Sequence, residues 1–170
     1  MYSETFDDFA TARCQLQNGV VNLKYATVEV GQGFVVLAPQ IARSVLGVDQ
    51  VIIDPVDTHI GSAGSTSASR QTWMSGGAVD GACRLVRQRL FEHVGKTHNI
   101  DPLRLMIEDN FVVDMLGDFR ISVIDASTGV FIEETFEHHH RPTQELDENG
   151  QGDCHVAFAF VAHRAVVDVD

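Results

Sequence analysis

Residues 54–71 form an uninterrupted run rich in Gly, Ser and Thr, placed between a short β-rich run at residues 51–53 and an amphipathic stretch. A segment of this length without regular structure is uncommon inside a compact domain and is usually functional or disordered. The amphipathic stretch predicts a helix over residues 72–90. Its apolar positions recur at helical spacing: Val79, Ala82, Cys83, Val86 and Leu90. The chain must therefore place a long polar loop directly before the amino end of a helix.

A second glycine-containing junction lies at Gly31-Gln32-Gly33. Residues 20–30 before it predict a long strand, although their alternation is imperfect. Apolar residues then return at helical spacing from Phe34 to Val45, and Gly47 is a suitable helix stop. The glycines of this junction let a ligand approach the backbone, and Gln32 can both donate and accept hydrogen bonds. The backbone N–H groups and small side chains of the other junction, before residue 72, suit an anionic ligand. The alternatives are a tight turn at the first junction and a flexible, capped surface loop at the second.

The other patterns are typical of an α+β fold with a mixed sheet and two main helices, in one unit that spans residues 1–170. They predict an irregular segment at 1–18, a hairpin of 103–107 and 111–115, an extended piece or short helix start at 120–124, a strand at 130–136, a loop at 137–153 and a long strand at 155–170. The last run is apolar on both faces, so we expect it to be buried on both sides.

Composition excludes several classes. Asp and Glu total 24 against 12 Lys and Arg, and the resulting net charge of −12 disfavours nucleic-acid binding. The apolar runs fall short of the roughly 20 residues that a membrane span needs. The first residues are acidic and polar, unlike a targeting leader, so we expect a cytoplasmic protein. Three widely spaced cysteines argue against a disulfide framework and a structural zinc site.

A histidine cluster, His138-His139-His140, could suggest metal binding. Successive side chains of an extended segment point to opposite sides, so three adjacent histidines rarely converge on one ion. A structural or surface role is therefore preferred, and the neighbouring acidic residues are interpreted as a solvated face. No convincing nucleophile arrangement is present, so no catalytic and no metal-ligating residue is predicted.

Taken in order, these stretches resemble the molybdenum-binding subunit of the xanthine dehydrogenase and aldehyde oxidase family, and most of all the bacterial xanthine dehydrogenases. The resemblance covers nearly the whole chain from about residue 20. It rests on these segments: residues 28–33 with Gly-Gln-Gly, 46–48, 51–53 with Asp57-Thr58, 61–72 with Gly76-Gly77-Ala78-Val79, 139–143, and 150–160.

The resemblance implies a molybdenum–pyranopterin cofactor, which in bacteria often has a cytosine dinucleotide form. It assigns cofactor contacts to two loops, 31–33 and 61–71. The residues concerned are Gly31, Gln32, Gly33, Thr66, Ser67, Ala68 and Ser69. The reaction implied is hydroxylation of a purine carbon beside a ring nitrogen, with water as the oxygen source. Electrons would leave through 2Fe-2S clusters and FAD on other domains or subunits.

The chain also departs from the family pattern. The family's general base is a Glu in a Gly-Glu pair, and no such pair occurs in this sequence. By the resemblance we expect a partial molybdopterin-binding domain, partnered by the remainder of the molybdenum subunit and inactive alone. Neither nucleic acid nor membrane is expected as a partner. The alternative is a non-catalytic remnant or binding module whose glycine-rich loops hold a phosphate-bearing ligand or a partner chain.

Overall fold

The computed structural model describes residues 8–62, 64–67, 70–153 and 162–169. The strands and helices, in chain order, are β1 (Phe9–Gln17), β2 (Val20–Tyr25), α1 (Phe34–Leu46), β3 (Gln50–Ile53), α2 (Gly76–His98), β4 (Leu105–Glu108), β5 (Phe111–Asp114), β6 (Arg120–Ser122), α3 (Val123–Ala126) and β7 (Ile132–His139).

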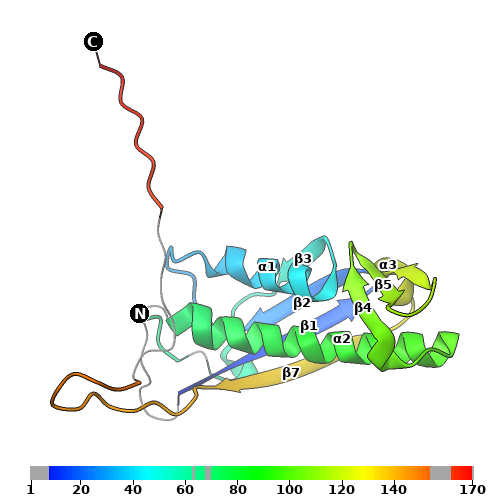
Figure 1. The fold of residues 1–170 in the computed structure, drawn as a ribbon, viewed down its shortest axis with the longest axis horizontal. Helices are drawn as coiled ribbons and strands as arrows, with labels where there is room; N and C mark the ends of the chain where they lie inside the picture. The colour runs from blue at the N-terminus through cyan, green and yellow to red at the C-terminus, as the bar shows by residue number, and fades with distance from the viewer. Residues whose placement is uncertain (1–7, 63, 68–69, 154–161, 170) are drawn as a thin grey trace.

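A mixed sheet with the strand order β3-β2-β1-β7 forms the centre of the molecule. Strand β1 is antiparallel to β2 and to β7, whereas β2 and β3 are parallel and are connected through α1. A second, antiparallel sheet has the order β4-β5-β6 and lies near one end of α2 (Figure 1). The predicted α+β class with a mixed sheet and two main helices is confirmed.

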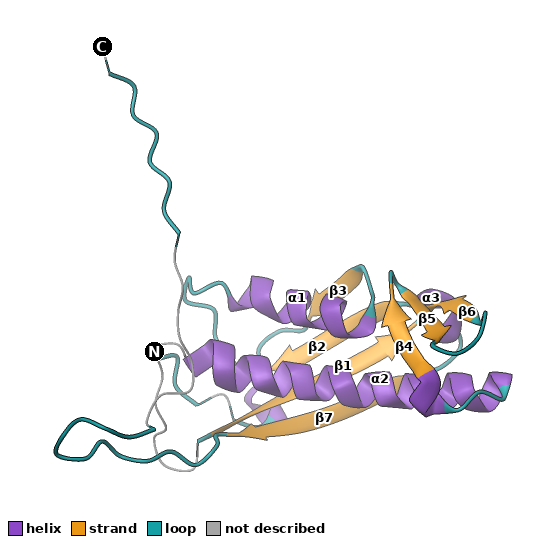
Figure 2. Cartoon of the chain, in the orientation of Figure 1, coloured by secondary structure: helices purple, strands orange, loops and turns teal. Residues whose placement is uncertain are grey.

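The two long helices lie side by side over one face of the four-stranded sheet, as the purple helices of Figure 2 show. Alternate residues of the strands are buried beneath them, including Leu16 on β1 and Leu23 on β2, both 0% exposed. The opposite face carries polar side chains such as Arg13 and Lys24. This one-sided burial is the usual arrangement of an antiparallel sheet that has a helical layer on one side.

Strand β1 was not expected, because residues 1–18 were predicted to be irregular. Its inward positions are mostly small: Ala10, Ala12 and Cys14 precede Leu16, and all four are fully buried. Small side chains are only weakly hydrophobic, so the alternation of buried and exposed residues in this strand is hard to recognise in the sequence. Asn18 and Gly19 form the two-residue turn to β2, both with positive φ (50° and 74°), which is the conformation that Asn-Gly hairpins prefer.

Several boundaries differ from prediction. Strand β2 ends at Tyr25, so residues 26–30 do not continue the strand. The amino end of α2 is preceded by a π-helical turn over Gln71–Ser75, and the helix continues to His98 rather than Leu90. All five residues of its predicted apolar stripe are buried. Helix α1 begins and ends as predicted, with Gly47 at φ 60° donating its N–H to the Arg43 carbonyl.

The hairpin predicted around residues 108–110 is confirmed, since β4 pairs with β5 across Asp109 and Asn110. Residues 120–126 combine both predicted alternatives, because β6 leads directly into the short helix α3. The strand predicted at 130–136 is present as β7, but it begins at Ile132 and continues to His139, so the predicted loop at 137–153 is wrong over residues 137–139. The predicted final strand is wrong over residues 162–169, which are exposed and belong to no strand, and residues 154–161 lie outside the described part.

Candidate functional site

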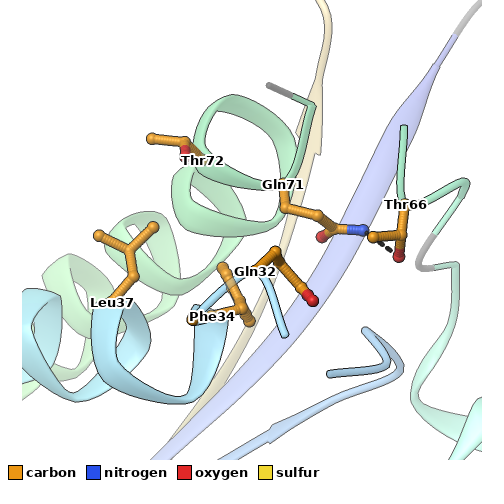
Figure 3. Close-up of a pocket in the computed structure, with 7 residues that line it drawn as sticks. Gln32, Phe34, Leu37, Thr66, Gln71 and Thr72 are labelled. Carbon is orange, nitrogen blue, oxygen red and sulfur yellow. Dashed lines mark hydrogen bonds between the residues drawn. The ribbon is translucent and has the colours of Figure 1, made fainter. Parts of the chain in front are cut away.

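A cavity of about 220 Å³ lies where the amino end of α1 meets the segment that precedes α2 (Figure 3). Its walls come from two parts of the chain that are distant in sequence. One wall consists of Gln32, Gly33, Phe34 and Leu37, and the other of Thr66, Gln71 and Thr72. None of these seven residues has an ionisable side chain. This surface can therefore bind and orient a ligand, but it supplies no acid or base of its own.

The first wall begins with a turn that Glu29 organises. One oxygen of its carboxylate accepts hydrogen bonds from the N–H groups of Gly31 (2.8 Å) and Gly33 (3.0 Å), and the other accepts from Val35 (3.1 Å). The two glycines adopt φ values of 100° and 81°, which side-chain-bearing residues rarely adopt. These backbone hydrogen bonds, led by that of Gly33, lower the pKa of Glu29. Glu29 thus acts as the anionic cap of α1.

The side chain of Gln32 closes the same turn. Its Oε1 accepts the Val30 N–H at 2.7 Å, and its Nε2 donates to the Val28 carbonyl at 2.9 Å. An amide side chain has two N–H groups and two lone pairs on oxygen. Each end therefore keeps one further hydrogen bond available for a ligand while the loop stays closed.

The buried side chain of Arg70, which is 2% exposed, contacts the loop that forms the second wall. Its guanidinium forms two hydrogen bonds to the Asp8 carboxylate, at 2.7 and 2.5 Å. It also donates to the carbonyl of Ser65 at 3.3 Å. Gly64 lies directly against this guanidinium, with φ 56° and no room for a side chain. The buried ion pair therefore joins the loop to the beginning of β1.

Gln71 joins the same loop to the other side of the site. Its Nε2 donates to Thr66 Oγ1 at 3.0 Å and to the Ser65 carbonyl at 3.3 Å. Its Oε1 accepts from the Ser75 hydroxyl, which accepts in turn from the Thr27 hydroxyl at 2.8 Å. Gln71, Ser75 and Thr27 are 5%, 2% and 3% exposed. A series of hydrogen bonds between buried side chains thus extends from Thr27, just after β2, to the cavity.

A sequence profile of the molybdopterin cofactor-binding domain family matches residues 2–170. The chain belongs to this family. The resemblance to molybdenum hydroxylases drawn from the sequence is thereby confirmed at the level of the cofactor-binding domain. Within the described residues, no helix is both long and apolar enough to cross a membrane.

The chain is also similar, in sequence or in fold, to parts of larger proteins. The large subunit of nicotine 6-hydroxylase from Paenarthrobacter nicotinovorans is 27% identical over 133 residues, which is 76% of this chain and 16% of that protein. Quinoline 2-oxidoreductase from Pseudomonas putida 86 superposes with a TM-score of 0.66 at 19% identity, covering 75% of this chain and 19% of the other. The Cu,Mo-CO dehydrogenase superposes with a TM-score of 0.64 at 18% identity, covering 79% and 18%. The chain thus spans less than a fifth of the length of these relatives.

The residues of the cavity fit a molybdopterin cofactor in their chemistry. They offer neutral donors, acceptors and an apolar surface but no metal ligand. Among the described residues, no cluster of three His, Cys, Asp or Glu side chains could hold a metal ion. The family resemblance implies that the pyranopterin itself would hold the molybdenum, through its dithiolene sulfurs, so no metal ligand is required of these residues. The fit is therefore to the organic part of the cofactor.

The structure brings Gln32, Gly33 and Thr66 to one cavity, as the sequence analysis expected of the two loops. Gly31 forms the adjacent turn, and Ser67 is exposed without lining the cavity. Ala68 and Ser69 lie outside the described residues. The other four lining residues were not named individually: Gln71 is the last residue of the predicted loop 61–71, whereas Phe34, Leu37 and Thr72 lie outside both predicted loops. The position of Gln71 and Thr72 at the end of the second loop was the signal that could have identified them.

The histidine cluster alternates as expected. The His138 ring is half-buried against α2, 5.9 Å from the ring of Trp73, while His139 points to the other side and stacks on Phe9. His138 Nε2 and Trp73 Nε1 are buried without a hydrogen-bond partner in the described structure. Burial, followed by the charges of the neighbouring histidines, lowers the pKa of His138. His138 thus serves packing between β7 and α2 in this domain.

Proposed function

We propose that this domain forms one wall of the molybdenum–pterin site of a molybdenum hydroxylase. The observation that supports the proposal best is the cavity shared by Gln32, Gly33 and Thr66, in a chain whose family binds this cofactor. At about 220 Å³, the cavity is smaller than the roughly 300–1,000 Å³ typical of small-molecule sites. It would therefore hold part of the cofactor, and the rest of the enzyme would enclose the remainder.

The roles of the residues follow from their geometry. The free N–H and lone pair of Gln32 would bond polar edges of the pterin, and Phe34 and Leu37 would contact its flat ring. The hydroxyl of Thr66 would face an oxygen atom of the cofactor. When bound, the cofactor would supply the redox centre for hydroxylation. The cavity residues would hold it in place and exclude water.

The remaining expectations concern the complete enzyme. We infer a cofactor in the cytosine dinucleotide form and electron transfer through 2Fe-2S and FAD groups on other domains or subunits. The substrate we favour is a purine, hydroxylated beside a ring nitrogen, on the strength of the sequence resemblance to bacterial xanthine dehydrogenases. Two of the related proteins are named for other nitrogen heterocycles, nicotine and quinoline. A cytoplasmic location agrees with these cofactors.

The cofactor is tested by purifying the full-length protein with the subunits that copurify and measuring its molybdenum, pterin and released nucleotide by mass spectrometry. We expect molybdenum, pterin and cytidine monophosphate. Gln32→Ala should lower molybdenum and pterin several-fold. Gln40→Ala, which removes an exposed glutamine farther along α1, should leave both unchanged. Tight binding of a plain nucleotide without pterin would instead favour a binding module.

The substrate is tested on the same preparation by comparing hypoxanthine and xanthine with quinoline and nicotine. Faster turnover of the purines, with incorporation of oxygen from labelled water, is the expected result. Turnover of quinoline or nicotine alone would replace the purine assignment without affecting the cofactor proposal.

A further inference from the structure

The hydrogen bonds that connect Thr27, Ser75, Gln71 and Thr66 have only one consistent direction. The direction is set by the carbonyl oxygen of Ser65, which can only accept and which lies 3.3 Å from one end of the Gln71 amide. That end is therefore the NH₂ group, and the opposite end is the carbonyl oxygen. The same NH₂ group also faces Thr66 Oγ1 at 3.0 Å.

The hydroxyl groups on the other side of Gln71 follow this orientation. Because Gln71 Oε1 can only accept, the Ser75 hydroxyl must donate its hydrogen to it. The lone pair of Ser75 then accepts the hydrogen of the Thr27 hydroxyl, at 2.8 Å. Every hydrogen in this series thus points from Thr27 towards the cavity.

Thr66 is the last member of the series, and its hydroxyl hydrogen is not used within the series. Its oxygen already accepts from Gln71, so its own O–H is left to donate. Within the described structure, no protein acceptor is bonded to it. Thr66 is exposed and lines the cavity, and Figure 3 shows the Gln71 nitrogen directed at its hydroxyl. Both hydrogens of the Gln71 NH₂ group are used by Ser65 and Thr66, so Gln71 has none to offer a ligand.

We propose that Gln71 is a positioning residue that presents the Thr66 hydroxyl to the cavity as a hydrogen-bond donor, selecting a ligand with an anionic oxygen at that point. The ligand class is a phosphoryl or metal-oxo oxygen. The inference rests on the proposed function, since it takes the bound ligand to be the molybdenum–pterin cofactor. A carboxylate at position 71 would accept the Thr66 hydrogen and so turn the Thr66 lone pairs towards the ligand.

The test compares Gln71→Glu, Thr66→Val and the double variant in the full-length protein with its copurifying subunits. The readout is the rate at which molybdenum and pterin are lost on dilution and gel filtration. We expect each single variant to lose them roughly tenfold faster, the order expected for a hydrogen bond to a charged group. The double variant should be no faster than Thr66→Val, because Gln71 acts through the Thr66 hydroxyl. Thr97→Val, at an exposed hydroxyl on α2, is the matched control and should change nothing.

Two outcomes overturn the inference. If Gln71→Glu accelerates loss equally in the Thr66→Val background, Gln71 acts through its charge or the fold. If Thr66→Val keeps its cofactor as well as the parent protein, the hydroxyl is no donor to it. Gln71→Met, which adds no charge, is carried through the same cycle in case Gln71→Glu does not fold. A parent protein that holds neither molybdenum nor pterin would instead contradict the proposed function.

Discussion

The ring of Phe136 on β7 occupies the space that a side chain at Gly81 of α2 would fill. One helical turn earlier, Gly77 is similarly close to the ring of His138, and a Cβ there would lie 2.8 Å from the ring atoms. Two glycines on one face of α2 therefore allow the helix to lie close to the edge strand β7. This close approach lets α2 pack directly against β7.

Gly81→Ala is expected to destabilise the protein by about 1–3 kcal/mol, because the added methyl group must displace the Phe136 ring. Gly76→Ala is the matched control. It lies in the same helix, and its added Cβ would meet nothing closer than 3.6 Å. Helix propensity alone should make that variant more stable, by up to about 1 kcal/mol. Urea denaturation of both variants measures the difference, and equal stabilities would contradict the packing argument.

Glu29 gives a second prediction, on pH dependence. Its pKa is lowered by backbone hydrogen bonds, first those of Gly33 and Val35. The stabilisation of the folded protein by ionised Glu29 should therefore be complete at pH values above the ordinary pKa of a glutamate. It should disappear as pH falls through the lowered pKa of Glu29 in the folded protein. Glu29→Gln should lower the denaturation midpoint at pH 7 and converge with the parent protein in acid. A midpoint difference that is constant from pH 7 to pH 3 would show that the charge is not responsible.

The sequence predicted those elements whose local pattern and tertiary surroundings agree. Helix α2 has a continuous apolar stripe, and α1 ends at a glycine in the left-handed conformation. The hairpin turn at Asp109 and Asn110 likewise uses residues that tolerate positive φ, at 47° and 65°. Strand β1 was missed because its buried face is small, although Asn18-Gly19 marked the turn that follows it.

The candidate site was predictable in part. Gly31-Gln32-Gly33 and Thr66 carry local signals, namely glycines before a helix and a hydroxyl-rich loop. The place of Gln71 at the end of that loop is a local signal for the cavity, but its hydrogen-bonding role has none. It depends on Ser75 one turn later and on Thr27, which is 48 residues from Ser75 in the sequence. Only the tertiary fold, which places the segment after β2 beside the π-helical turn before α2, brings these side chains together.

The histidine on β7 leads to a third prediction. Burial is the main cause that lowers the pKa of His138 below its ordinary value, about 6.5. The unfolded chain therefore takes up a proton as pH falls through about 6.5, while the folded protein does so only at lower pH. Stability should thus decline between pH 7 and 5.5, before the carboxylates titrate. In His138→Gln, the urea midpoint should fall less steeply between pH 7 and pH 5.5 than in the parent protein. An equally steep fall in both proteins would show that other groups cause the pH dependence.

Two buried cysteines give a fourth prediction. The Sγ atoms of Cys14 and Cys83 lie 3.7 Å apart, and both side chains are fully buried. The hydrogen bond with Cys83, followed by burial, raises the pKa of the Cys14 thiol. Since the thiolate is the reactive form, iodoacetamide at pH 8 should leave both cysteines unmodified in the native protein and alkylate them in urea. Peptide mass spectrometry measures the extent of alkylation at each cysteine. Alkylation of Cys14 in the native protein would contradict its burial.

The pairing of Arg70 with Asp8 gives the last prediction. Their side chains are 2% and 11% exposed, so Asp8→Ala would remove a carboxylate that forms two hydrogen bonds to a buried guanidinium. Removing one partner of a buried ion pair costs about 3–5 kcal/mol. Asp80→Ala, which breaks an exposed pair with Arg84, should cost no more than about 1 kcal/mol. Since Arg70 also bonds the Ser65 carbonyl, Asp8→Ala should loosen the loop that carries Thr66 and speed cofactor loss. Equal urea midpoints for the two variants would contradict the larger contribution to stability that we assign to the buried ion pair.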